Sequence, residues 1–115
     1  MPSTTTYKRG DLVLVAFPFT NLASLKRRPA LVVSPDPFNH AMQDLALVAI
    51  TSQVTDDSRL TIDAGDCIEG GLPKKSVVKP TKLFTMHATL VLKKLGTLRP
   101  EKLETILGDL RAFFS

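Results

Sequence analysis

Short apolar runs, separated by residues that favour turns, make up most of the chain. The first run, residues 12–17, is rich in Val and almost uninterrupted, which indicates a strand buried on both faces. A second run, residues 30–33, begins directly after Pro29, and a third covers residues 45–50. Since the polar segment 19–28 joins the first two runs, we predict a hairpin with a long, exposed and basic connecting loop.

Shorter extended pieces follow the third run. Residues 35–44 contain two prolines and an asparagine, so we predict a loop there with room for one helical turn. Residues 59–62 alternate polar and apolar, as a half-exposed strand does. Glycines on either side of Cys67 and Ile68 mark turns around a short element. The remaining extended pieces are residues 76–79, which end at Pro80, and residues 83–86 and 90–98.

The last segment changes to a helical period. Pro100 suits a first helical position, and Glu101 and Glu104 complement the helix dipole near its start. Apolar side chains then recur at i, i+3, i+4 and i+7 from Leu103 to Leu110. We therefore predict an amphipathic helix of about four turns that packs on the sheet. Five to seven short strands before one C-terminal helix favour a small, strongly curved antiparallel barrel.

Length and composition restrict the class of protein. A chain of 115 residues forms one domain, residues 1–115, and 43% apolar with 23% charged residues is typical of a globular protein. Cys67 is the only cysteine, so no disulfide forms within the chain, which fits a reducing compartment. The polar N-terminus has no apolar signal region, and the run 45–50 is too short to span a membrane. We expect a cytoplasmic protein.

Charge is strongly segregated along the chain. Residues 1–34 carry a net charge of +4, residues 35–73 of −6 and residues 74–99 of +7. If the two basic segments converge in space, they form a positive groove that attracts a phosphate chain. The same pattern also fits solvated basic faces that keep the protein soluble, and charge alone does not separate the two interpretations.

No familiar catalytic or metal-binding motif occurs in the sequence. It contains no zinc-type cysteine or histidine spacing, no phosphate-binding glycine loop and no calcium loop. His40 and His87 are far apart and are better explained as surface or half-buried side chains. Cys67 lies among acids, which disfavour a thiolate. We expect neither a metal nor another cofactor.

Two features remain as candidate chemistry. Arg28 is tied by Pro29 to the start of a buried strand, and a rigidly held Arg engages a phosphate bidentately. The third apolar run ends in three hydrogen-bonding side chains, Thr51, Ser52 and Gln53, which suit phosphate or base edges. Ordinary exposed cations and strand-end turn chemistry are the plainer interpretations of these features.

Together, these stretches resemble the MazF/PemK family of toxins from toxin–antitoxin pairs. Four segments match in order along nearly the whole chain: residues 10–15, residues 17–21 with 26–34 (Lys26-Arg27-Arg28-Pro29 and the run after it), residues 49–53, and residues 71–80 with 83–85. The resemblance implies an SH3-like antiparallel barrel of the MazF, PemK and CcdB kind with a C-terminal helix, usually as a homodimer. It also implies a metal-independent endoribonuclease that cleaves single-stranded RNA at short sequences.

Residue by residue, the resemblance assigns the catalytic Arg to Arg28 and the Thr after the third strand to Thr51. Because RNA supplies its own nucleophile, the 2′-OH, such an enzyme needs donors that stabilise charge on the phosphate rather than a protein nucleophile. Some members carry an Arg and an Asp on the late strand where this chain has Lys79 and Thr81. The further RNA-binding candidates are Lys26, Arg27, Ser52, Gln53, Lys79, Lys82 and Phe19.

A toxin of this kind requires an antitoxin, and we expect an acidic partner whose tail crosses the basic groove and covers Arg28. Two other functions stay open on the sequence. One is a small barrel that binds nucleic acid without cleaving it, and the other is a growth inhibitor on the same fold whose target is a protein.

Overall fold

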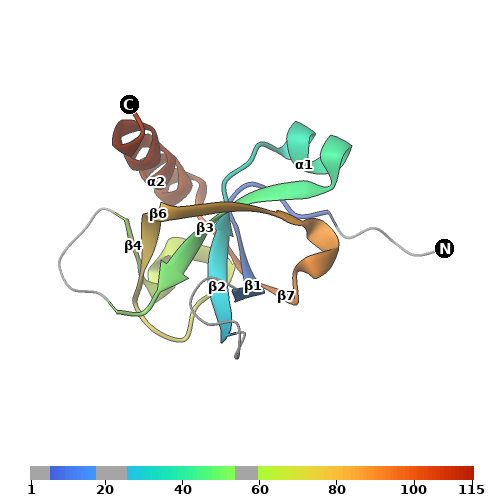
Figure 1. Cartoon of the computed structure of the whole chain (residues 1–115). Helices are drawn as coiled ribbons and strands as arrows, with labels where there is room; N and C mark the ends of the chain where they lie inside the picture. Colours follow the sequence, from blue (N-terminus) through green and yellow to red (C-terminus); the bar gives the residue numbers. More distant parts are fainter. Residues whose placement is uncertain (1–5, 18–25, 54–59) are drawn as a thin grey trace.

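The computed structural model describes residues 6–17, 26–53 and 60–115, which form one curled antiparallel sheet with short helices and a longer C-terminal helix (Figure 1). The strand order in the sheet is β4-β6-β3-β2-β1-β7-β5. The strands are β1 (Asp11–Phe17), β2 (Lys26–Val32), β3 (Asp44–Thr51), β4 (Thr61–Ile62), β5 (Cys67–Gly70), β6 (Ser76–His87) and β7 (Lys93–Leu98). The helices are α1 (Asp36–Met42), α2 (Pro100–Phe113) and the 3₁₀ turns η1 (Ala64–Asp66) and η2 (Ala88–Leu90). The expected class, mainly β with a C-terminal helix, is confirmed.

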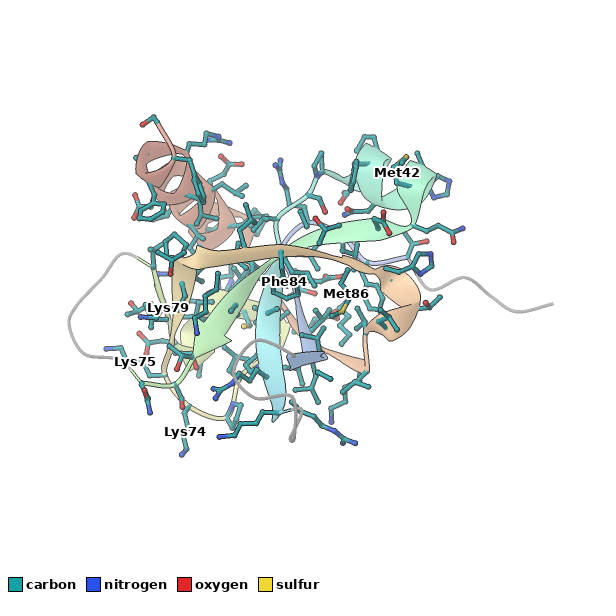
Figure 2. The ribbon with its side chains drawn as sticks, in the orientation of Figure 1. Met42, Lys74, Lys75, Lys79, Phe84 and Met86 are labelled. Carbon is teal, nitrogen blue, oxygen red and sulfur yellow. The ribbon has the colours of Figure 1, made fainter. Side chains whose placement is uncertain are left out.

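The apolar stretches of the three central strands, β1 to β3, are buried on both faces, as their near-continuous runs predict, while Lys26–Pro29 of β2 are exposed or half-buried. One face, with Leu12, Leu31 and Val48 fully buried, packs against α2 through Ile106, Leu107 and Leu110. The other face, with Val13, Val15, Ala30 and Val32, is covered by Tyr7 and by partly buried side chains of the second half of β6 and of η2. Figure 2 shows two of these, Phe84 and Met86, along β6.

The helix α2 begins at the predicted Pro100 and presents the predicted apolar face. Ile106, Leu107 and Leu110 are buried in it, and Gly108 lies where a Cβ would meet no neighbour within 4 Å. The helical turn expected within residues 35–44 is a helix of seven residues, α1. Neither helix, nor any other helix in the described ranges, is long and apolar enough to cross a membrane.

The basic segment before Pro29 differs from the prediction. Lys26, Arg27 and Arg28 are not loop residues: they are the first residues of β2 and pair with Phe17, Ala16 and Val15 of β1. Charged residues give no strand signal in the sequence, so this pairing is imposed by the neighbouring strand β1. The basic residues, Lys26 and Arg27 exposed and Arg28 half-buried, are therefore held by the sheet.

The late extended pieces join into one long strand. Residues 76–79 and 83–86, predicted as separate, both belong to β6. The register with β3 shifts between Val48 and Ile50, which pair with Leu83 and Val78, so residues 79–82 lie opposite the single residue Ala49. Pro80 is tolerated there because a bulge does not need its missing N–H. The bulge lets β6 bend around β3 and β4.

Candidate functional site

A gap between the ends of β2 and β3 follows directly from Pro29. The Gly10 N–H donates to the Val32 carbonyl, and the Val33 N–H donates to the Ala46 carbonyl. Val32 therefore directs its backbone groups toward β1, and Val33 directs its backbone groups toward β3. Because successive residues of a strand alternate in this way, the backbone nitrogen of Pro29 also faces β3. Pro29 has no N–H to donate, and the pairing of β2 with β3 ends at Ala30 and Ala49, while pairing with β1 continues to Lys26.

A pocket of about 260 Å³ occupies the place where the two strands separate. Three segments line it: Arg27, Arg28 and Pro29 of β2; Ile50, Thr51 and Ser52 at the end of β3; and Leu72, Pro73, Lys74 and Ser76 of the β5–β6 connection and the start of β6. Continued by two residues, the Ala30–Ala49 register brings Arg28 opposite Thr51. The pocket thus combines three cationic side chains with the accessible hydroxyl groups of Thr51 and Ser52.

Thr51 is held in a defined orientation by the backbone that follows it. The Gln53 N–H donates to Thr51 Oγ1 at 3.2 Å. Since this oxygen already accepts one hydrogen bond, its own hydrogen remains available to donate. Thr51 is half-buried, so its hydroxyl is fixed while still reachable by a ligand.

The pocket is electropositive because its cations are not neutralised by the described carboxylates. The ion pairs in the described ranges belong to other regions: Lys94 Nζ lies 2.8 Å from Glu69 Oε1 and 3.6 Å from Asp11 Oδ1, and Lys102 pairs with Asp66 at 3.7 Å. None of them involves Arg27, Arg28 or Lys74. An anion that enters the pocket meets net positive charge from two sides.

Of the residues predicted as catalytic or RNA-binding, four meet at this pocket: Arg27, Arg28, Thr51 and Ser52. Lys26 is exposed beside them on β2, and Gln53 contributes its backbone N–H to Thr51. Lys79 and Lys82 are exposed at the bulge of β6 and do not line the pocket. Phe19 lies outside the described residues.

Lys74 is a pocket residue that sequence reasoning missed. Figure 2 shows it at the end of the β5–β6 connection, with Lys75 beside it and Lys79 further along β6. The sequence shows a run of basic residues after residue 73, but nothing in that run distinguishes Lys74 from its neighbours. Only the fold brings residue 74 to residues 28 and 51.

Cys67 and the histidines do not contribute to this site. Cys67 is buried, and burial, with the nearby Asp66 charge, raises the pKa of its thiol. A protonated, buried thiol is a poor nucleophile. His87 Nδ1 lies 2.8 Å from Thr89 Oγ1 and accepts from the Thr89 N–H, which makes it a cap for η2.

The same fold is found in solved toxin structures. The chain superposes on MazF in a MazE–MazF crystal structure (Form-II) from Deinococcus radiodurans with a TM-score of 0.73 and 22% identity, over 96% of this chain and 97% of that one. The Mycobacterium tuberculosis toxin MazF-mt6 gives a TM-score of 0.71 and 16% identity, over 90% of this chain and 95% of that one. An endoribonuclease in complex with its cognate antitoxin, from a mycobacterial species, gives 0.69 and 16%, over 96% and 95%.

Comparison with curated protein sequences found no match. A family model described as "PemK-like, MazF-like toxin of type II toxin-antitoxin system" matches residues 8–114. That match covers nearly the whole chain and agrees with the fold. The chain therefore belongs to the PemK-like, MazF-like toxins of type II toxin–antitoxin systems.

Proposed function

We propose that this protein is a metal-independent endoribonuclease that inhibits growth by cleaving single-stranded RNA, in particular mRNA, in the cytoplasm. The observation that carries the proposal is the pocket in which Arg28 of β2, Thr51 of β3 and Lys74 of the β5–β6 connection meet. Three cations and the accessible hydroxyls of Thr51 and Ser52 around one hollow suit a phosphodiester. The mycobacterial relative described as an endoribonuclease supports the same activity.

The chemistry is transesterification within the RNA. The 2′-oxygen of a ribose attacks the adjacent phosphorus, the bond from phosphorus to the 5′-oxygen breaks, and the products are a 2′,3′-cyclic phosphate and a 5′-hydroxyl. The 2′-OH loses its proton, and the departing 5′-oxygen gains one. Negative charge grows on the nonbridging oxygens in the transition state, where preorganised donors are most effective.

In the proposal, Arg28 stabilises this charge with its guanidinium, and Thr51 donates its hydroxyl hydrogen to a nonbridging oxygen. Arg28 lies in a paired strand and the Thr51 oxygen is held by the Gln53 N–H, so neither donor needs large rearrangement before the reaction. Arg27 and Ser52 bind the RNA in the same pocket. Lys26, Gln53, Lys79, Lys82 and Phe19 extend its path.

The antitoxin is the second part of the proposal. Two of the similar structures are complexes of a toxin with its antitoxin. We expect an acidic partner whose extended tail covers Arg28, because the pocket is electropositive and open to solvent. If the bound partner left RNA cleavage unchanged, this part would be refuted.

A homodimer is the third part. A mainly apolar hollow of about 300 Å³ beside α2 and β6 is lined by Leu83, Leu107, Leu110 and Phe114 among others, with Arg9 and Arg111 also in its lining. Phe113 and Phe114 are 52% and 58% exposed, which is unusual for neighbouring aromatic side chains and supports contact with a second copy. Sedimentation equilibrium of the purified protein tests this: a monomer at micromolar concentration would refute it.

The test of the activity is incubation of the purified protein with single-stranded RNA in excess EDTA. The proposal predicts RNA fragments that end in 2′,3′-cyclic phosphate. A DNA oligonucleotide of the same sequence should stay intact, since DNA lacks the 2′-OH. Tight RNA binding without fragments would favour the non-catalytic nucleic-acid-binding barrel. Growth arrest on expression with intact cellular RNA would favour a protein target.

A further inference from the structure

Lys74 is the cationic residue that lines the pocket from the β5–β6 connection rather than from β2. Arg27 and Arg28 come from β2, whereas Lys74 comes from the connection between β5 and β6. Its neighbour Lys75 is also exposed but does not line the pocket. The fold therefore distinguishes two adjacent lysines that the sequence presents as equivalent.

The main chain at Lys74 is anchored on both sides. Before it, Gly70 has a φ of +59°, and a Cβ there would collide with the Leu95 carbonyl. The Gly71 N–H donates to that same carbonyl at 3.0 Å, which ties the connection to β7.

After Lys74, the Ser76 hydroxyl, on a residue only 3% exposed, donates to the Lys74 carbonyl at 2.9 Å. Pro73 fixes the preceding φ angle. The base of the Lys74 side chain is thus held at the pocket before any ligand arrives, which lowers the entropy cost of a contact made by its ammonium group.

An ammonium and a guanidinium bind phosphates in different ways. A lysine is a compact point charge on a flexible stem, whereas an arginine offers a rigid fork that matches two oxygens of one phosphate. In the described ranges Lys74 has no ion pair that would have to break first. Because it lines the pocket from a different segment than Arg28, it suits a phosphate that is next to the reacting one along the RNA chain.

We propose that Lys74 is an RNA-positioning residue that holds a second backbone phosphate of the RNA, adjacent to the phosphate bound by Arg28. The inference rests on the proposed function and adds to it the side of the pocket along which the RNA backbone continues beyond the reacting phosphate. Lys74 acts on binding and not on the bond that breaks. Its loss raises KM and leaves kcat unchanged.

The experiment compares Lys74→Gln with the matched neighbour Lys75→Gln and with Lys74→Arg. Binding is measured by fluorescence anisotropy with a short single-stranded 2′-O-methyl oligonucleotide, which lacks the nucleophile and is not cleaved. Lys74→Gln is expected to weaken binding about fivefold and to reduce the slope of log K against log salt by about 0.7, the value for one phosphate contact on a single strand. Lys75→Gln is expected to bind like the wild type, and Lys74→Arg to keep the wild-type salt slope.

The outcomes separate this inference from the proposed function. If the wild type binds the oligonucleotide but leaves unmodified RNA intact, the proposed cleavage fails, and the comparison of the two glutamine variants still decides the role of Lys74. Equal binding and equal salt slopes for Lys74→Gln and Lys75→Gln would overturn the inference. So would a fall in kcat without a change in KM, which would place Lys74 on the reacting phosphate. Equal thermal midpoints for both variants check that the fold is intact.

Discussion

Replacing Thr51 with Val removes a hydroxyl at nearly constant shape, which makes it a sharp test of the proposed donor. The stability cost is small. The hydrogen bond that disappears joins Thr51 Oγ1 to the N–H of Gln53, an exposed residue, so water can take over as acceptor. We expect a loss of at most about 1 kcal/mol in the free energy of unfolding, the usual net contribution of one hydrogen bond.

The catalytic cost is expected to be much larger. A donor aimed at charge that develops in the transition state is worth about a hundredfold in rate, or about 2.7 kcal/mol. Thr51→Val should therefore cleave RNA about a hundredfold more slowly under single-turnover conditions while it unfolds in urea close to the wild-type midpoint. Thr51→Ser keeps the hydroxyl and should lose no more than about tenfold in rate.

The matched control is Thr85→Val, the same change at an exposed position in the second half of β6 that does not line the pocket. It should cleave RNA at the wild-type rate. Two results would refute the reasoning: cleavage by Thr51→Val at the wild-type rate, or an equal loss in Thr51→Ser and Thr51→Val, which would mean that shape rather than the hydroxyl matters.

Two further predictions concern stability. Asn39 is 4% exposed, accepts from the Ser34 hydroxyl and donates to the carbonyls of Ser34 at 3.0 Å and Tyr7 at 3.3 Å. Asn39→Ala leaves these buried groups without partners and should lower the free energy of urea unfolding by about 2–3 kcal/mol, whereas His40→Ala, exposed on the same helix, should cost under about 0.5 kcal/mol; equal midpoints would contradict this. Hydrogen bonds from Lys94 and Thr97, with the Lys94 charge, lower the pKa of Glu69, and the hydrogen bond to Glu69 raises the pKa of Lys94. The Glu69 contribution is therefore complete above its ordinary pKa of about 4.3 and is lost as pH falls through the lowered value, while that of Lys94 is lost only as pH rises through its raised value. Glu69→Gln should flatten the acid limb of a plot of urea midpoint against pH, and parallel curves for variant and wild type would contradict the pairing.

Much of the fold could be predicted from local patterns. The apolar stretches of β1, β2 and β3 are buried on both faces, so they show as near-continuous apolar runs, and α2 shows a clean helical period after Pro100. The helix α1 is harder to predict because Pro35 and Pro37 are typical of loops, although a proline is compatible with the first turn of a helix.

The parts that could not be predicted depend on pairing at a distance. Lys26, Arg27 and Arg28 are a strand only because β1 continues beside them. The strand β6 continues past Pro80 because Pro80 lies in a bulge opposite Ala49. The candidate pair Arg28 and Thr51 was predictable from its family resemblance and from the position of Pro29, whereas the arrival of Lys74 at the same pocket depends on the path of the β5–β6 connection.

The most direct test of the central claim is the rate of RNA cleavage by Arg28→Ala in EDTA under single-turnover conditions, beside the wild type and Arg27→Ala. The claim predicts 2′,3′-cyclic phosphate ends from the wild type and a loss of about a hundredfold or more in Arg28→Ala at saturating protein. Arg27→Ala, exposed on the same strand, should require more protein for saturation and reach nearly the wild-type rate. Cleavage by Arg28→Ala at the wild-type rate, or a wild-type protein that binds RNA and yields no cyclic phosphate, would contradict the claim.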